Sequence, residues 1–167
     1  PDFHRRIRIP TYEIGGWFDI FSQGTLENFT GLQANGAGLA AGNQKVVMGP
    51  YAHGVLEGRL KFPDDRSGQL LGGEDRFRWF DRWLKGVKNG IDTEPPVRYY
   101  VLGDPEDPGA PGNEWRTATS WPPPARATSY FLAAGGRLDR ELPAAGPAST
   151  TYTYDPKNPV PTVGGAN

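Results

Sequence analysis

Ile14-Gly15-Gly16-Trp17-Phe18-Asp19 is the stretch on which the interpretation of this sequence depends, because it puts a carboxylate directly after an apolar segment. Apolar side chains alternate through residues 7–16 around Pro10, which predicts a strand with the proline near its start. Over residues 20–29 the apolar side chains recur at roughly helical spacing, so we expect a helix that a following glycine can end. A strand that leads through Asp19 into a helix is typical of an α/β fold.

A second predicted strand is followed by a histidine. Residues 44–50 form a short apolar run bounded by turn residues, as expected of a buried parallel strand, and His53 comes just after it. In open α/β sheets the reactive groups lie beyond the carboxyl ends of the strands. A carboxylate that holds one ring nitrogen of a histidine can direct the other nitrogen toward a nucleophile. Asp19 and His53 are therefore the candidate catalytic residues.

The clearest helix is predicted over residues 74–85. Its apolar side chains fall within one broad arc with charged side chains opposite, and Gly86 or Gly90 can cap its end. Trp79 and Trp83 stand at helical spacing within the arc, which favours core packing over a ligand platform.

The sequence changes character after the proline-rich residues 93–96. Short strands separated by Pro, Gly and Asp clusters predict an antiparallel β-sandwich. These predicted strands cover residues 97–102, 115–119, 128–132 and 150–154. The chain is thus expected to consist of an α/β part over residues 1–92 and an incomplete β-sandwich domain over residues 93–167.

The composition excludes several classes of protein. The 18 basic and 19 acidic residues give a net charge of -1, so we expect no nucleic-acid and no membrane partner. There is no cysteine, and the two histidines lack metal-ligand spacing, so neither a metal nor a cofactor is expected. No apolar run approaches the roughly 18 residues of a membrane span. The localisation is open, and a soluble, cytoplasmic protein is favoured.

No serine of the chain is placed as a nucleophile. None has the Gly-x-Ser-x-Gly frame of a nucleophile elbow, and all follow Asp19, whereas the α/β-hydrolase order puts the nucleophile before the acid. The serines are Ser22, Ser67, Ser120, Ser129 and Ser149. Ser22, close to Asp19, is expected to face solvent or to bond locally.

The candidate residues also have structural interpretations. An aspartate before a helix is a preferred N-cap, and a histidine in a loop with glycine can be a structural hydrogen-bonder. For Asp19 and His53 both interpretations stay open. His4, in a charged N-terminal segment, is expected to be solvated. For Trp115 and Trp121, core or interdomain packing is favoured over stacking on a sugar.

Several segments match, in order, the pattern of one family. They are Gly15-Gly16-Trp17-Phe18-Asp19, Gly49-Pro50-Tyr51-Ala52-His53-Gly54, Trp79-Phe80-Asp81-Arg82-Trp83-Leu84-Lys85-Gly86, Pro96-Val97-Arg98 leading through Gly103 to Trp115-Arg116 and Trp121-Pro122, and Asp155-Pro156 followed by Pro159-Val160-Pro161-Thr162-Val163-Gly164-Gly165. Together they resemble the CocE/NonD hydrolases, which are serine hydrolases related to Xaa-Pro dipeptidyl-peptidases, bacterial cocaine esterase and the cephalosporin acylases. The similarity covers nearly the whole chain.

The resemblance implies a fold and two roles. Residues 1–92 would be the C-terminal segment of an α/β-hydrolase domain, and residues 93–167 the beginning of a jelly-roll β-sandwich domain. Asp19 would be the acid and His53 the base of a triad whose serine belongs to an N-terminal portion with no counterpart here. Relatives that act on α-amino acyl esters carry acidic residues just after the triad Asp, where this chain has Ile20 and Phe21, so that substrate class is not favoured.

The leading hypothesis is a part of a serine hydrolase that cleaves a small-molecule ester or amide substrate by acyl transfer to water. The chain alone is expected to be inactive. Its expected partner is the missing N-terminal hydrolase segment or another subunit of an oligomer, since two parallel strands cut from their neighbours expose an edge and an apolar face. The alternatives are a non-catalytic β-sandwich module that binds a ligand through Trp115 or Trp121, and an Xaa-Pro dipeptidyl-peptidase of the same family.

Overall fold

The computed structural model describes residues 2–53, 60–64, 66, 73–107, 109–143, 149 and 151–161. The described residues form two compact units, one up to residue 123 and one over residues 124–161. In chain order the elements are η1 (Asp2–Arg6), β1 (Tyr12–Gly16), α1 (Ser22–Asn35), β2 (Lys45–Gly49), α3 (Glu74–Lys85), β3 (Val97–Val101), β4 (Glu114–Ala118), β5 (Phe131–Ala133) and β6 (Arg137–Asp139).

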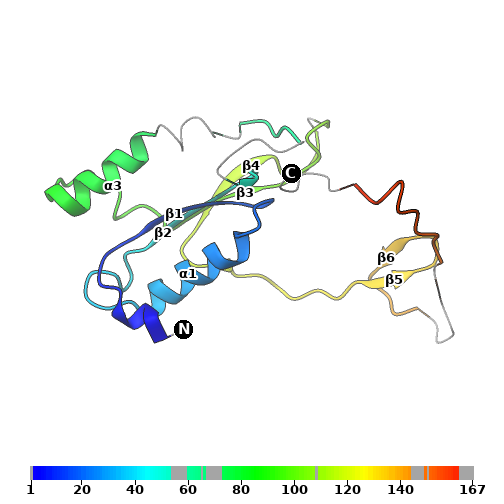
Figure 1. Cartoon of the computed structure of the whole chain (residues 1–167), viewed down its shortest axis with the longest axis horizontal. Helices are drawn as coiled ribbons and strands as arrows, with labels where there is room; N and C mark the ends of the chain where they lie inside the picture. Colours follow the sequence, from blue (N-terminus) through cyan, green and yellow to red (C-terminus); the bar gives the residue numbers. More distant parts are fainter. Residues whose placement is uncertain are drawn as a thin grey trace. The chain divides into compact units, whose positions relative to one another are not determined.

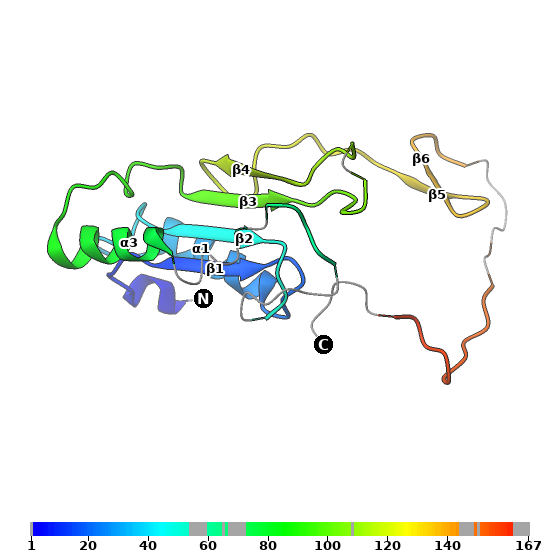
Figure 2. The same cartoon turned by 90° about the horizontal axis from the view of Figure 1, so that it is seen from above.

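The first unit is built on a four-stranded sheet with the order β1-β2-β3-β4. β1 and β3 run parallel to β2, and β4 pairs antiparallel with β3, so the four strands lie side by side (Figure 2). Between β1 and β2 the chain passes through α1, the kind of crossover that parallel strands require. A mixed sheet with few helices confirms the α/β character of this part of the sequence.

β1 is shorter than the predicted strand over residues 7–16. It begins at Tyr12, after Pro10, which has no backbone N–H to donate to a neighbouring strand. Before it, the carbonyl of Ile7 accepts the N–H of Ala37 beyond the end of α1 at 2.8 Å. The residues before Tyr12 therefore connect to the loop after α1 and not to the sheet.

One face of the sheet packs against α1, which lies below the strands in Figure 1. The buried side chains of this core are Phe29 from α1, Val46 and Met48 from β2, and Val97 from β3. All five residues of β2 are buried, as predicted for a strand covered on both faces. Phe29, at 1% exposure, anchors α1 to the sheet.

The other face of the sheet carries a second apolar cluster. Val47 and Tyr51 are fully buried there, with Ile14 and Trp115 packed against them. Tyr12 extends this cluster toward α3, because its ring stacks on Trp79 with 5.6 Å between the ring centroids. Trp79 is 5% exposed, so its predicted place in the core is confirmed.

The bounds predicted for α3 are confirmed at residues 74–85. Gly86 ends the helix in the left-handed conformation with φ of 72°, and the N–H of Val87 donates to the carbonyl of Asp81 at 3.0 Å. Three other members of the apolar arc are exposed. Phe77, Phe80 and Leu84 are 69%, 53% and 78% exposed, because among the described residues α3 meets the sheet mainly through Trp79.

A chain of charged groups joins α3 to β2 and β3. Lys45 of β2 is buried, and its Nζ donates to Glu94 at 2.5 Å. Glu94 also accepts from Arg78 of α3 at 2.6 Å, while Asp75 bridges Arg78 at 3.0 Å and Arg98 of β3 at 2.9 Å. Burial alone would raise the pKa of Glu94, but the hydrogen bonds from Lys45 and Arg78 outweigh it and hold that pKa below its ordinary value.

The second unit contains the antiparallel hairpin of β5 and β6. Gly135 and Gly136 form its turn with φ of 76° and 72°, a conformation that glycine adopts without strain. β5 is shorter than the strand predicted over residues 128–132. The strand predicted over residues 150–154 is wrong for the described residues 151–154, which are irregular and exposed, because no neighbouring strand among the described residues pairs with them.

The division of the chain into domains over residues 1–92 and 93–167 stays a prediction. β3 and β4, which follow that division, continue the sheet of β1 and β2. The jelly-roll and α/β-hydrolase assignments likewise stay predictions, and the observed architecture is a mixed sheet with few helices plus a small hairpin unit.

Candidate catalytic site

The loops after β1 and β2 carry the two candidate residues, and the backbone joins these loops. In the parallel register Gly16 lies opposite Gly49 at the ends of the two strands. Beyond them the N–H of Trp17 donates to the carbonyl of Gly49 at 2.9 Å, and the N–H of Phe18 donates to the carbonyl of Tyr51 at 3.0 Å. The strand pairing therefore continues into the loops and brings Asp19 and His53 to the same edge of the sheet.

Asp19 is held by its own turn. Its N–H donates to the carbonyl of Gly16 at 3.2 Å, and its Oδ1 accepts the N–H of Phe21 at 2.9 Å. The N-cap position of α1 is Phe21, so Asp19 lies two residues before the cap. Its side chain is only 12% exposed, which fixes the direction of the carboxylate.

The carboxylate of Asp19 faces the imidazole of His53. Nδ1 of His53 is 3.2 Å from both Oδ1 and Oδ2 of Asp19. The edge of the Phe21 ring packs beside the imidazole, with 5.2 Å between centroids and an interplanar angle of 69°. With Nδ1–H donating to the carboxylate, Nε2 keeps its lone pair and can accept a proton. The His53 side chain is 61% exposed, so another molecule or segment can reach it.

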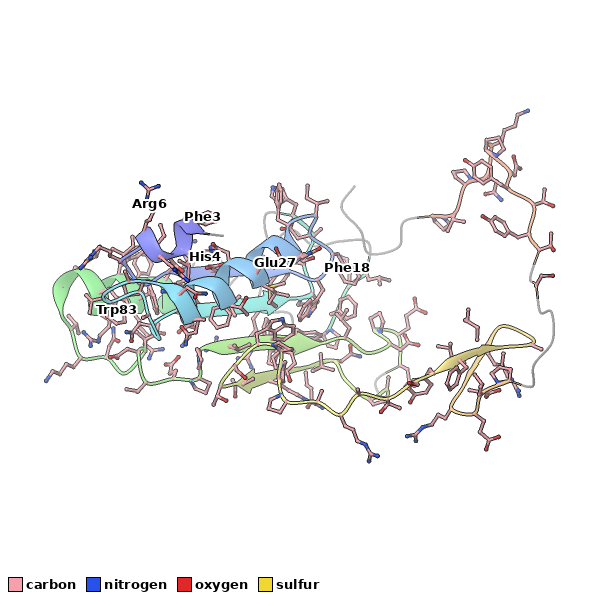
Figure 3. All side chains as sticks on the ribbon, turned by 90° about the horizontal axis from the view of Figure 1, so that it is seen from below. Phe3, His4, Arg6, Phe18, Glu27 and Trp83 are labelled. Atoms are coloured by element: carbon pink, nitrogen blue, oxygen red, sulfur yellow. The ribbon has the colours of Figure 1, made fainter. Side chains whose placement is uncertain are left out.

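His4 does not lie where the sequence analysis put it. It is 3% exposed, and its Nε2 is 3.2 Å from Oδ1 of Asn28 in α1. Figure 3 shows it on η1 against α1. The prediction of a solvated His4 is wrong because Gly31, which has no side chain, leaves room for the imidazole on the helix surface.

The sequence analysis missed Glu13, which belongs to the same polar cluster. Its Oε1 accepts from Asn28 at 3.0 Å and from Thr11 at 3.1 Å. Burial raises the pKa of Glu13 to about 7, against the opposing effect of these two hydrogen bonds. A charged residue facing α1 from an otherwise apolar strand is the signal that could have identified it.

The tryptophans that could have bound a ligand pack within the first unit. Trp115 packs against Val47 and Tyr51, and its Nε1 donates to the carbonyl of Asp64 at 2.7 Å. Trp121 lies against Trp17 with 5.7 Å between centroids. The packing favoured for both residues agrees with these contacts.

The serines do not complete a triad within the part of the chain that the structure describes. Ser22 begins α1, and its N–H donates to the carbonyl of Asp19 at 3.1 Å. No hydrogen bond joins a serine hydroxyl to His53 among the described residues, and Ser67 lies outside them. Those residues also contain no group of His, Cys, Asp and Glu side chains able to hold a metal ion, and none of their helices is long and apolar enough to cross a membrane.

Comparison with known proteins relates this chain to parts of known hydrolases. Residues 89–162 match the X-Pro dipeptidyl-peptidase C-terminal non-catalytic domain. A candidate serine esterase of Mycobacterium bovis is 31% identical over 152 residues, which cover 86% of this chain and 21% of that protein. The cocaine esterase of a Rhodococcus species is 30% identical over 169 residues, which cover 93% of this chain and 27% of that protein.

Solved structures agree on the fold. The crystal structure of a CocE/NonD family hydrolase from Staphylococcus aureus aligns with a TM-score of 0.55 and 18% identity, over 83% of this chain and 22% of that one. This chain is related to the C-terminal part of the CocE/NonD hydrolases. It spans 21% to 27% of the length of the curated relatives that it matches. The CocE/NonD resemblance drawn from the sequence motifs is confirmed.

Proposed function

We propose that this chain supplies the acid and the base of a Ser-His-Asp triad in a hydrolase that cleaves esters or amides. Asp19 is the acid, His53 is the base, and the serine comes from a part of the protein outside this chain. The observation that carries the proposal is the contact of 3.2 Å between Nδ1 of His53 and both carboxylate oxygens of a largely buried Asp19. The names of the matched relatives, which include a cocaine esterase, support an ester as substrate.

In this reaction Nε2 of His53 takes the proton of the serine hydroxyl as the serine oxygen attacks the carbonyl carbon. His53 then gives the proton to the leaving alcohol or amine, and an acyl-enzyme remains for water to hydrolyse. Asp19 holds the ring in the tautomer with Nδ1–H and stabilises the imidazolium that forms. The 61% exposure of the His53 side chain gives the serine and the substrate access to Nε2.

The first test measures hydrolysis of a p-nitrophenyl ester by the protein as its gene encodes it. His53→Ala should lower kcat by about 10⁶-fold, and Asp19→Asn should lower it by about 10⁴-fold because the imidazole loses its tautomer. Asp104→Asn changes an exposed loop carboxylate that accepts a local backbone N–H, so it should leave kcat unchanged. Activity above a few per cent in His53→Ala would remove the proposal.

The source of the nucleophile is tested separately with a serine-directed fluorophosphonate. The 167-residue chain alone should be neither labelled nor active, whereas the protein that contains it should be labelled at a serine outside this chain. A label on a serine of this chain would contradict the assignment.

A second candidate function rests on the match of residues 89–162 to a non-catalytic domain. On this alternative the chain is a binding or interaction module, and loss of His53 has no effect on turnover. An Xaa-Pro dipeptidyl-peptidase is the third possibility, supported by the name of the same domain. Release of p-nitroaniline from a Gly-Pro anilide, at a rate above that of the p-nitrophenyl ester, would favour it.

A further inference from the structure

The position of the His53 imidazole depends on the loop that carries it. More than half of the side chain is open to solvent, at 61% exposure, and its contacts among the described residues include Asp19 and the ring edge of Phe21. A side chain this exposed takes its position largely from its backbone. The element that fixes this backbone therefore also fixes the distance between His53 and Asp19.

Tyr51 is the residue that fixes the loop. It is fully buried at 0% exposure, in the apolar cluster with Val47. Its carbonyl accepts the N–H of Phe18 at 3.0 Å. Because Phe18 directly precedes Asp19 and Tyr51 stands two residues before His53, this backbone hydrogen bond joins the two loops close to the candidate catalytic residues.

Two glycines leave the space that Tyr51 occupies. A Cβ on Gly16 would lie 2.7 Å from the carbonyl carbon of Tyr51 and would overlap its oxygen. A Cβ on Gly49 would overlap the Tyr51 ring. Neither glycine is among those with positive φ, so space and not backbone conformation requires glycine at both positions.

We infer that Tyr51, with Gly16 and Gly49 around it, positions the base of the proposed triad by clamping the His53 loop to the Asp19 loop. This inference rests on the proposed function for its catalytic meaning. A methyl group at position 16 pushes the Tyr51 carbonyl away from the N–H of Phe18. The His53 ring then moves out of reach of the Asp19 carboxylate, although neither residue has been changed.

The test compares Gly16→Ala with Gly15→Ala in the protein as its gene encodes it. A Cβ at position 15 meets chiefly Sδ of Met48 at 2.8 Å, the adaptable part of a flexible side chain, so Gly15→Ala is the matched control. Nitrogen-15 NMR of the imidazole reports the Nδ1–H of His53, with His4 as internal reference. Gly16→Ala should lose the His53 Nδ1–H signal, and kcat should fall about 100-fold with KM changed less than about threefold. Gly15→Ala should keep both within about twofold.

A folded Gly16→Ala variant with the wild-type Nδ1–H signal overturns the inference. If circular dichroism shows that this variant does not fold, hydrogen exchange of the Phe18 amide in the wild-type protein decides instead. Exchange slowed at least about 100-fold relative to an unstructured peptide supports the clamp, and exchange at the peptide rate overturns it. An intact Nδ1–H signal in a wild-type protein without esterase activity would remove the proposed function and leave the clamp in place.

Discussion

Glu13 links protonation to folding at the scale of a single residue. Burial raises its pKa to about 7, from an ordinary value of 4.5, and the hydrogen bonds from Thr11 and Asn28 only partly oppose this. A folded-state pKa above the unfolded one means that the folded protein holds the proton more tightly. The resulting stabilisation is fully present below pH 4.5 and is lost as the pH rises through about 7.

We predict that Glu13→Gln removes this pH dependence. Glutamine keeps an oxygen that can accept from Thr11 and Asn28 but carries no charge. Between pH 4.5 and pH 7 the free energy of unfolding of the wild type should fall by about 1–2 kcal/mol, while that of Glu13→Gln should lack this fall. This magnitude allows for solvent screening of a half-buried group. Urea denaturation at a series of pH values measures the difference.

Glu27→Gln is the matched control for this experiment. Glu27 is exposed on α1, and its Oε1 accepts from Gln23 at 2.7 Å, so its replacement should leave the pH profile like that of the wild type. Equal pH profiles for the wild type and Glu13→Gln would contradict the raised pKa.

The sequence predicts the contacts and burial of some single residues and not of others. The contact between Asp19 and His53 follows from one rule, since both stand just beyond the carboxyl ends of apolar strands. The burial of His4 does not follow from its charged neighbours in the sequence, because it depends on Gly31 of the distant helix α1. Glu13 was missed for the same reason, since its donor Asn28 comes from α1.

At the scale of elements, the two helices use glycine in opposite ways. Gly24 lies in the first turn of α1, where nothing is within 4 Å of a Cβ. Gly86 ends α3 with φ of 72°, where an added Cβ meets no atom but strains the backbone. The first glycine weakens its helix and the second one ends its helix.

Substitution by alanine should therefore have opposite effects at these two positions. Gly24→Ala should raise the free energy of unfolding by about 0.5–1 kcal/mol, because alanine loses less backbone entropy. Gly86→Ala should lower it by about 1 kcal/mol or more. Thermal melts of the two variants measure both effects. If both substitutions changed the free energy of unfolding in the same direction, backbone conformation would not be the cause of these changes.

The sequence predicts elements well where their ends are marked. The bounds of α3 follow from the sequence because the apolar arc runs through the segment and Gly86 directly follows it. The strand predicted over residues 150–154 failed because a strand exists only beside another strand, and residues 151–154 have none among the described residues. The hairpin of β5 and β6 has strands too short to show a clear alternation.

On the scale of the whole first unit, the ion pair between the buried Lys45 and the partly exposed Glu94 holds separate elements together. Lys45 is 2% exposed on β2, and Glu94 also accepts from Arg78 of α3. A buried ammonium group that loses its carboxylate keeps the cost of its lost hydration. Because the pKa of Glu94 is lowered in the folded state, its stabilisation is present above its ordinary pKa and is lost as the pH falls.

Glu94→Gln should therefore lower the free energy of unfolding by about 3 kcal/mol at pH 7. The difference from the wild type should shrink as the pH falls below about 4.5. Glu114→Gln breaks an ion pair with Arg116 in which both side chains are more than half exposed, at 52% and 55%, and should cost less than about 1 kcal/mol. Similar losses in both variants, measured by urea denaturation, would show that burial of Lys45 adds nothing.

Part of the apolar arc of α3 is exposed within the part of the chain that the structure describes. Phe77, Phe80 and Leu84 lie open to solvent, and the chain spans 21% to 27% of its curated relatives. Their helical spacing is typical of a helix face that packs against other residues.

The backbone hydrogen bond between Phe18 and Tyr51 has a consequence for which exposed residues beside Asp19 can vary in evolution. Ile20 and Phe21, next to Asp19, are 71% and 57% exposed, and of these two only Phe21 contributes a backbone N–H to the carboxylate. The Ile20 side chain can change in size and polarity without disturbing these contacts, whereas the Phe21 ring packs against the His53 imidazole. A library randomised at position 20 would thus vary the surface beside the candidate catalytic pair while its contacts stay constant.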